Sequence, residues 1–466
     1  MKETWATSAG LDLHVDVRGT RVRAGLESAL RDAIRSGRLA PGTALPASRA
    51  LALDLGVARN TVVDAYGQLV AEGWLAARHG SGTWVAERTE PPPGAARPRP
   101  AAQPPVTRYD LRPGVPDLSA FPRSAWLAAA RRALLSAPSS DLGYADPRGL
   151  EPLRTALAGY LSRARGVAVT PDRVVVCAGY AQALGLLCLV LRAAGVSRLA
   201  VEGFGIGVHR DIASGHGLQL SPLAVDAGGA VTSELTDEGA VLVTPAHQFP
   251  LGMALHPRRR REVVDWAAAT GALVIEDDYD GEFRYDRQAV GALQSLAHEH
   301  VAYAGTASKS LAPGLRLGWL VLPARLVDDV VDAKSTTERM SSSIEQLTLA
   351  EFISSGGYDR QVRRARLGYR QRRDRLVAEL ARRAPQVHVT GIAAGLHALV
   401  TLPPGTDEEA VIAEGARHGL SLTGLAGFAC GPQRPDPGLV VGYATPPGHA
   451  FSSAVARLCA VLREAA

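Results

Sequence analysis

Apolar positions in the N-terminal part of the chain first follow a helical period and then a strand period. Three stretches repeat apolar residues every three or four positions, and two later ones are short and rich in strand-forming residues. The helical stretches are residues 18–37, 49–55 and 58–72, and the strand-like ones are residues 74–78 and 83–85. Ser48 is the expected N-cap of the second helix, and Gly56 and Gly73 end the second and third. Two short helices followed by a hairpin predict a winged helix-turn-helix, an α+β fold whose second short helix can enter the major groove of DNA.

The rest of the chain alternates buried-strand patterns with helical ones. Short apolar runs read as strands at residues 173–177, 198–201, 240–243, 272–275, 301–304 and 317–322. The first run is followed by a helical pattern over residues 181–194. This alternation predicts an α/β domain with a largely parallel sheet. Ligands of such sheets bind at the carboxyl ends of the strands, so the residues there are the candidates for chemistry.

A proline-rich segment separates the two patterned regions. Residues 89–106 contain Pro91-Pro-Pro-Gly, Arg97-Pro-Arg-Pro and Gln103-Pro-Pro, with no periodic apolar positions. Such a composition predicts an extended, semi-rigid linker. The expected organisation is multidomain: a DNA-binding domain over residues 1–87, a linker over residues 88–106, and an effector and dimerisation domain over residues 107–466.

Composition is that of an ordinary soluble protein. Of the 466 residues, 46% are hydrophobic and 21% are charged, and no apolar run is long enough to span a bilayer. Residues 1–30 lack the basic-then-apolar pattern of a signal peptide, and the four cysteines are widely spread without metal-ligand spacing. We therefore expect a cytoplasmic protein without a metal site, a membrane span or disulfides.

The net charge of the chain neither requires nor excludes nucleic-acid binding. The net charge of +5 permits such binding without requiring it. Residues 1–86 carry 10 Lys and Arg against 8 Asp and Glu, so the first domain is only weakly basic. Because one weakly basic copy would bind DNA poorly, we expect a dimer that binds a double-stranded operator with paired half-sites.

The strongest candidate for chemistry is Lys309. It follows an apolar run over residues 300–304, lies beside the hydroxyl residues Thr306 and Ser308, and precedes Arg316. A lysine amine attacks carbonyls when its surroundings lower its pKa or hold it near an electrophile. Hydroxyls together with a guanidinium suit a phosphate. The combination suggests a phosphorylated aldehyde held as a Schiff base, which is pyridoxal 5'-phosphate (PLP).

Two further groups stand at expected strand ends. The amides of Ala178-Gly-Tyr-Ala-Gln182, between a strand and a helix, can cradle a phosphate. Asp277 could keep the pyridine nitrogen of PLP protonated, and Tyr279 could supply a phenol near the ring hydroxyl. Each group also has a purely structural interpretation: a strand-end cap for Asp277, turn residues for the hydroxyls, and a surface lysine for Lys309. Their order along one sheet favours a shared site over coincidence.

Several motifs in the first domain occur in a fixed order. They are Leu45-Pro-Ala-Ser-Arg49, Leu55-Gly-Val-Ala-Arg-Asn-Thr61, Ala65-Tyr66, Leu69-Val-Ala-Glu-Gly-Trp-Leu75 and Gly80-Ser-Gly-Thr83. Together they resemble the GntR-type winged helix; a small helical domain that binds no DNA is the plainer alternative. The resemblance implies that DNA is contacted by Arg49, Arg59, Asn60 and Thr61, and by His79 and Gly80 at the wing tip. Arg59 and Asn60 open the third helix, where Arg favours guanine and Asn favours adenine.

Motifs of the large segment extend this resemblance. They are Arg112-Pro-Gly-Val-Pro-Asp-Leu118 with Phe121-Pro122, Gly143-Tyr-Ala-Asp-Pro-Arg-Gly149 with Leu153-Arg154, Thr244-Pro-Ala-His-Gln-Phe-Pro250, Glu276-Asp-Asp-Tyr-Asp-Gly-Glu-Phe-Arg-Tyr285 and the stretch around Lys309. From about residue 15 onward, the chain resembles the MocR subfamily of GntR-type regulators, in which a winged helix is fused to a fold-type I aminotransferase-like α/β domain.

This resemblance implies a cofactor site and an assembly. PLP would be bound to Lys309 as an internal aldimine, with Asp277 at the ring nitrogen and Tyr279 at the ring hydroxyl. The phosphate would lie among Gly179, Tyr180, Ala181, Thr306, Ser308 and Arg316. The assembly would be a head-to-tail homodimer in which Tyr144 reaches the phosphate of the partner subunit.

The sequence departs from the aminotransferase pattern where a substrate would be gripped. Val440 stands where aminotransferases carry the arginine that binds the substrate carboxylate; Arg434 is a candidate substitute, and Arg210 remains a candidate carboxylate partner. Ile206 replaces an aromatic residue that lies over the site, and Phe249 replaces an asparagine that bonds the ring hydroxyl. These changes indicate retained PLP binding with weakened or absent transamination.

The leading hypothesis is a PLP-dependent transcriptional regulator that senses either PLP itself, as in the vitamin B6-responsive members of the subfamily, or an amino compound. A ligand of this kind shifts an equilibrium between two conformations of the protein only if it binds them with different affinities. The alternative is an active PLP-dependent aminotransferase with an appended DNA-binding domain. A third hypothesis is a DNA-binding protein whose large domain serves only as a dimerisation scaffold.

Overall fold

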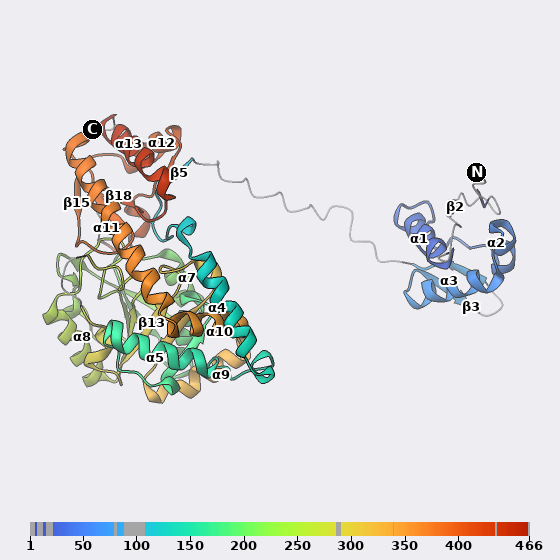
Figure 1. Cartoon of the computed structure of the whole chain (residues 1–466), viewed down its shortest axis with the longest axis horizontal. Helices are drawn as coiled ribbons and strands as arrows, with labels where there is room; N and C mark the ends of the chain where they lie inside the picture. Colours follow the sequence, from blue (N-terminus) through green and yellow to red (C-terminus); the bar gives the residue numbers. More distant parts are fainter. Residues whose placement is uncertain are drawn as a thin grey trace. The chain divides into compact units, whose positions relative to one another are not determined.

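The computed structural model describes residues 5–6, 13–14, 22–78, 82–87, 108–285, 290–338, 340–433 and 436–464. It divides into two compact units, residues 1–104 and 105–466 (Figure 1). Within the described residues, no helix is both long enough and apolar enough to cross a membrane.

The first unit has the expected order of helices and strands. It contains α1 (Val22–Arg35), α2 (Ser48–Leu55), α3 (Arg59–Ala71) and the antiparallel pair β3 (Leu75–Arg78) and β4 (Gly82–Val85), besides a short pair, β1 (Trp5–Ala6) and β2 (Leu13–His14). Leu26, Leu30, Leu51 and Leu69 are completely or almost completely buried in its core. The helical and strand periods of the sequence are therefore confirmed.

One detail of this unit differs from the sequence-based expectation. Ser48 is the first residue of α2 and does not cap it; Ala47 holds the N-cap position, and no side chain bonds the free amides there. The prediction of Ser48 as the N-cap was wrong by one residue. At the other end, Gly56 has the left-handed φ of 65° that the expected helix stop requires.

The second unit is built on a seven-stranded sheet. The strands are, in spatial order, β6 (Val174–Cys177), β14 (Gly318–Val321), β13 (Val301–Thr306), β12 (Leu273–Asp277), β11 (Ala240–Val243), β7 (Arg198–Glu202) and β8 (Gln219–Leu223). Only β14 runs antiparallel to its neighbours, and the other pairings are parallel. The largely parallel sheet predicted from the sequence is confirmed.

Helices cover both faces of this sheet, because alternate strand residues point to opposite sides. On one side, Val175, Ile275 and Leu320 pack against α6 (Tyr180–Ala193) and α9 (Val327–Thr337), with α7 (Gly207–Gly215) beside them. On the other side, Val176 and Val274 belong to clusters with α5 (Glu151–Arg165), α8 (Pro257–Thr270) and α10 (Ser343–Ser354). α4 (Arg123–Ser136) packs on α10.

A smaller lobe completes the second unit. It contains the antiparallel sheet β15 (His388–Thr390), β16 (Ala398–Thr401) and β18 (Gly438–Val441), the parallel pair β5 (Tyr109–Asp110) and β17 (Leu420–Ser421), and the helices α12 (Glu408–Arg417) and α13 (Gly448–Glu464); a separate short pair is β9 (Val225–Asp226) and β10 (Gly229–Ala230). The 27-residue helix α11 (Gly357–Arg383) joins this lobe to the large sheet (Figure 1). Its Tyr358 lies in the core of the large lobe, and its Leu376 lies in that of the small one.

Candidate functional site

The carboxyl ends of β6, β12 and β13 bring the expected cofactor residues together. Gly318 is paired with both Thr306 and Cys177, so the end of β13 lies level with the end of β6. Asp277 at the end of β12 is paired with Ala304 of β13. At this edge lies a hollow. Its lining includes Tyr180, Asp277, Tyr279, Thr306, Ser308 and Lys309, together with Gly114, Ile206, His209, Phe249, Leu396 and His397.

Lys309 is the lysine that lines this hollow. The chain has three lysines, and the other two are Lys2 and Lys334. The Lys309 amine donates a hydrogen bond of 2.6 Å to the carbonyl of Gly114. Burial lowers the pKa of Lys309, although the nearby Asp277 carboxylate opposes the shift. A lowered pKa enlarges the neutral fraction of the amine, which is the nucleophilic form.

Asp277 has a free acceptor at the same site. Its side chain is 5% exposed, and its buried Oδ1 has no hydrogen-bond partner among the described residues. Burial raises the pKa of Asp277 well above its usual range, and the Lys309 ammonium opposes the rise. A buried acceptor without a donor is costly. A protonated pyridine nitrogen would satisfy this oxygen and favour its ionised form, so the residue fits the ring of PLP.

A second part of the hollow suits the phosphate. α6 starts directly after Gly179 without a side-chain N-cap, so its first amides are available to an anion. Gly179 has a φ of 94°, and a Cβ there would lie 3.3 Å from Nη1 of Arg316. Arg316 itself has a left-handed φ of 54°, which is uncommon outside glycine. The Ser308 amide donates to Thr306 Oγ1 at 3.1 Å, and the Thr306 hydroxyl donates to the carbonyl of Leu317 at 3.2 Å. These bonds hold the hydroxyl of Thr306 close to the segment that carries Arg316.

Tyr279 is held by residues that the sequence did not single out. Its hydroxyl lies 3.1 Å from His247 Nδ1 and 3.1 Å from the backbone oxygen of His247. The same imidazole nitrogen lies 2.8 Å from Asp280 Oδ2. His247 occurs in a motif that the sequence had flagged, but its partner is 33 positions away. Only the fold could reveal the connection.

Two further histidines of the hollow were also missed. The His209 ring lies 4.6 Å from that of Tyr180, and burial lowers its pKa to about 4, so the imidazole is neutral near pH 7. The Nε2 atom of His397 is buried without a hydrogen-bond partner among the described residues. The His397 ring packs 4.9 Å from that of Phe249. Flat, neutral rings therefore line the hollow close to Ile206, which replaces the expected aromatic residue.

The residue that stands in place of the expected carboxylate-binding arginine is buried among apolar side chains. Val440 is completely buried in a cluster with Phe204, Leu251 and Leu425. Arg210 lines an adjoining hollow, but its Nη1 donates to the carbonyls of Gly205 at 2.9 Å and Phe428 at 3.1 Å. Arg434 lies outside the described residues. Position 440 therefore holds a valine instead of an arginine, and the guanidinium of Arg210 is already bonded to backbone carbonyls.

The residues expected to face DNA lie on the surface of the first unit. Arg59 and Asn60 are the first two residues of α3 and are exposed, Arg49 on α2 is exposed, and Thr61 is half-buried. α3 is held on α1 by Arg31, which donates bonds of 2.9 and 2.8 Å to Glu72. His79 and Gly80 of the wing tip lie outside the described residues.

Two family models match this chain. Residues 23–85 match the "Bacterial regulatory proteins, gntR family", and residues 113–434 match "Aminotransferase class I and II". The chain is 33% identical to the HTH-type pyridoxine biosynthesis transcriptional regulator PdxR of Corynebacterium glutamicum, over 91% of this chain and 92% of the relative. It is also 33% identical to the probable rhizopine catabolism regulatory protein MocR of Rhizobium meliloti, over 89% of this chain and 88% of the relative.

Solved structures show the same fold for the second unit. The kynurenine aminotransferase of Pyrococcus horikoshii covers 76% of this chain and 90% of its own, with a TM-score of 0.68 and 22% identity. LysN, the α-aminoadipate aminotransferase of Thermus thermophilus, solved with N-(5'-phosphopyridoxyl)-L-leucine, also gives a TM-score of 0.68 and 22% identity, and covers 76% of this chain and 92% of its own. The expected fold-type I architecture is confirmed.

Proposed function

Since this chain belongs to the MocR subfamily of GntR-type transcriptional regulators, we propose that it controls transcription in response to PLP, or to an amine captured by PLP, bound at Lys309. The observation that carries the proposal is the buried Oδ1 of Asp277, which has no hydrogen-bond partner in the part of the chain that the structure describes and lies in the hollow that Lys309 lines. It supports cofactor binding in a chain that also has the winged helix of a DNA-binding protein.

Each residue of the hollow has a distinct task in this proposal. PLP supplies an electrophilic carbonyl carbon and an electron-withdrawing ring when it is bound. The Lys309 amine, in its neutral form, is the nucleophile that holds the cofactor covalently. Asp277 orients the ring and keeps its nitrogen protonated, while Tyr279, positioned by His247, faces the ring hydroxyl. Arg316, Thr306, Ser308 and the first amides of α6 hold the phosphate.

The effector is PLP itself or an amine that lacks an α-carboxylate. The buried Val440 cannot pair with a carboxylate, and Arg210 already donates to two backbone carbonyls. Tight, saturable binding of an ordinary α-amino acid, detected as a change in the visible absorbance of the PLP-loaded protein, would overturn this assignment.

The experiment that tests the proposed function is a footprint on the DNA upstream of the protein's own gene. The PLP-free and PLP-loaded proteins are compared on the same fragment. We expect a protected region with paired half-sites, whose affinity or extent changes on loading. An identical footprint and affinity in both states would contradict sensing at the DNA-binding step.

Asp277 offers a test of cofactor binding that does not involve DNA. We expect Asp277→Asn to weaken PLP binding by roughly 10- to 150-fold, since a hydrogen bond to a charged group contributes about 1.5–3 kcal/mol. Equilibrium dialysis of the full-length protein measures the loss. Asp211→Asn, on an exposed position of α7, is the matched control and should leave the affinity unchanged. Equal affinity of Asp277→Asn and the control would remove Asp277 from the site.

A homodimer is the assembly that the surface of the second unit supports. α4 presents a row of leucines at helical spacing, and Leu127 and Leu135 are 70% and 78% exposed in the single chain. Leu142 and Tyr144, which follow in sequence, are 56% and 87% exposed. Apolar surface of this kind marks an interface. We propose that two copies pair head-to-tail through this surface and that Tyr144 of each copy contacts the phosphate of PLP held by the other.

Charge on α4 should disrupt this dimer. We expect Leu127→Glu with Leu135→Glu to raise the dimer dissociation constant by at least about 30-fold, because burying an unpaired carboxylate in an apolar interface costs several kcal/mol. Sedimentation over a concentration series measures the shift. Leu296→Glu is the control, since Leu296 is 54% exposed elsewhere in the unit. Unchanged dimerisation in the α4 variant would exclude this surface.

A further inference from the structure

The long helix α11 holds the largest concentration of positive charge in the chain. Its 27 residues include ten arginines and three acidic residues, which gives the helix a net charge of +7. The whole chain has a net charge of +5, so the remainder is slightly acidic overall. Residues 1–86, the winged-helix region, carry only 10 basic against 8 acidic residues. The charge needed to hold DNA phosphates is therefore found mainly outside the winged helix.

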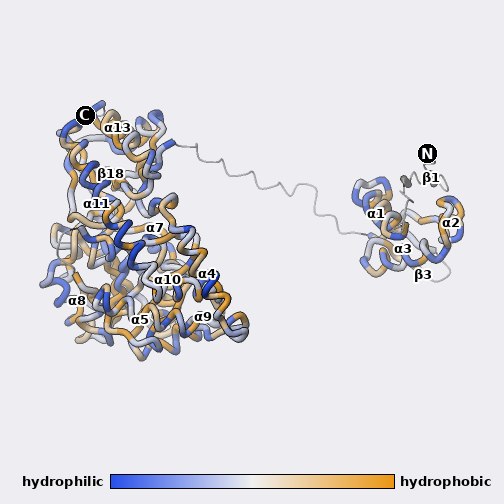
Figure 2. Tube along the Cα trace, viewed as in Figure 1, coloured by the Kyte–Doolittle hydropathy of each residue, from blue (hydrophilic) through white to orange (hydrophobic). Residues whose placement is uncertain are grey.

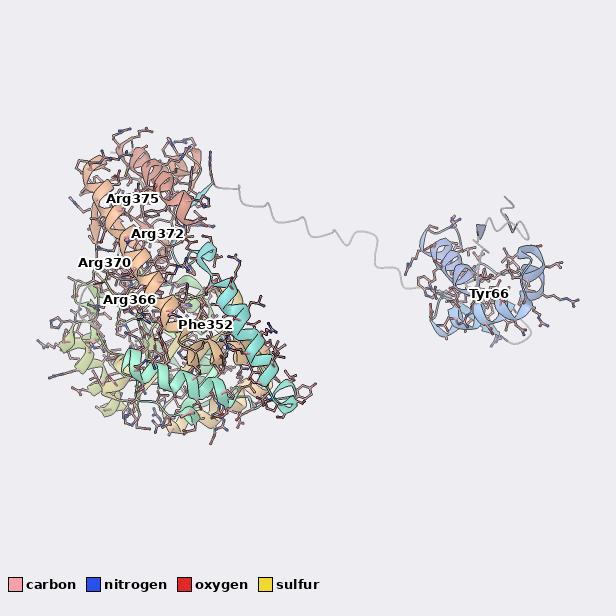
Figure 3. The ribbon with its side chains drawn as sticks, in the orientation of Figure 1. Tyr66, Phe352, Arg366, Arg370, Arg372 and Arg375 are labelled. Atoms are coloured by element: carbon pink, nitrogen blue, oxygen red, sulfur yellow. The ribbon has the colours of Figure 1, made fainter. Side chains whose placement is uncertain are left out.

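Many of these arginines extend into solvent along the helix. Arg360, Arg363, Arg364, Arg370, Arg375 and Arg382 are exposed. At 3.6 residues per turn their positions fall within about 140° of the helix circumference, so they share one side of α11. Figure 3 labels Arg366, Arg370, Arg372 and Arg375 along it, and Figure 2 shows hydrophilic residues over much of its length. At about 1.5 Å per residue the helix is about 40 Å long, which is slightly more than one helical turn of DNA, about 34–36 Å.

Internal contacts hold some arginines of α11 but not all of them. Arg360 and Arg363 donate to the carbonyls of Ser355 and Asp359, and Arg382 pairs with Glu379. Arg372 is bonded to Asp117 at 2.5 Å and to nearby carbonyls, and it anchors the helix. By contrast, Arg364 and Arg375 form no hydrogen bond or ion pair with a described residue. Arg370 makes only a long contact of 3.8 Å with Asp374, with both side chains about 60% exposed. Arg364, Arg370 and Arg375 can therefore bind an external anion without breaking a strong contact within the protein.

We propose that the exposed side of α11 is a second, sequence-independent DNA-binding surface, which holds the phosphate backbone of DNA that flanks the operator. The inference rests on the proposed function, because it requires that the winged helix brings the chain to DNA. Arginine side chains in a row bind phosphates by direct pairing and by release of counterions. The winged helix then reads the sequence, and α11 adds affinity that depends strongly on salt but not on sequence.

The test compares two duplexes that share one operator. The short duplex contains only the paired half-sites, and the long one extends by two helical turns, about 21 bp, on each side. Full-length wild-type protein and the variant Arg364→Gln/Arg370→Gln/Arg375→Gln are titrated with both duplexes over a range of salt concentrations. On the long duplex we expect the variant to bind roughly tenfold more weakly, with a salt slope smaller by about 2 to 3. On the short duplex the two proteins should bind alike.

A charge-matched control separates α11 from the net charge of the protein. The variant Arg192→Gln/Arg258→Gln/Arg261→Gln removes three exposed arginines of α6 and α8, and it should behave like the wild type on both duplexes. Equal binding of the wild type and the α11 variant to the long duplex overturns the inference. An acidic protein would then be the alternative partner of this surface. An equal loss in both triple variants also overturns it, because net charge would then be the cause. If the wild type binds neither duplex, the proposed function itself fails, and this inference fails with it.

Discussion

We expect Lys309→Ala to abolish covalent attachment of PLP and, with it, the change in operator binding that PLP causes. Lys309 is the lysine of the hollow, and its pKa is lowered by burial. Lys334, also buried, donates its hydrogens to the carbonyls of Pro147 and Val176 at 2.7 Å each, so its amine is committed to the fold. No other described lysine can replace Lys309 at the cofactor. The affinity of the PLP-free variant for DNA should stay within about twofold of that of the PLP-free wild type, because neither protein carries the cofactor and the residues expected to face DNA are unchanged.

Mass spectrometry after borohydride reduction measures this attachment, and a DNA titration with and without PLP measures the response. Lys309→Arg is a useful companion, because it keeps the positive charge but cannot form the covalent bond. Both variants should lose the response. If the alanine variant still carried PLP on a lysine, the assignment of Lys309 would be wrong. If it lost PLP but kept a normal PLP response in DNA binding, the hollow would not be the sensor site.

The second large effect is expected at the start of α3. We expect Arg59→Ala and Asn60→Ala each to weaken specific operator binding by roughly 5- to 150-fold, since a bidentate contact to a base contributes about 1–3 kcal/mol. Both residues are exposed at the helix end, where side chains reach base edges. Binding to a scrambled duplex should change much less, because phosphate contacts dominate there.

Competition between operator and scrambled duplexes measures this specificity. Arg23→Ala is the matched control, since Arg23 is exposed on α1 and pairs with Glu27 at 2.8 Å. Its operator affinity should change little. A loss of the same size on operator and scrambled DNA in the α3 variants would assign these residues to the phosphate backbone. No loss at all would place base recognition elsewhere in the first unit.

Local patterns in the sequence determined the division of the chain into helices and strands. The 3.6-residue period located α1 and α3, and the apolar runs located the strands of the large sheet, because backbone geometry fixes which positions share a face. The sequence located helix ends less accurately than helices. Ser48 lies inside the helix that it was expected to cap, and such shifts of one or two residues are common because the ends of helices fray.

Lys309, Asp277, Thr306 and Ser308 could be proposed from sequence alone, because each stands at or just after the carboxyl end of a strand. Only the tertiary structure decided how they work together. The pairing of Thr306 with Gly318, and of Gly318 with Cys177, brings Arg316 to Gly179, although the two are more than a hundred positions apart. The same holds for His209 and His397, for the buried apolar surroundings of Val440, and for the carbonyls that occupy Arg210. These contacts depend on strand register and on packing between distant segments, which no local sequence period encodes.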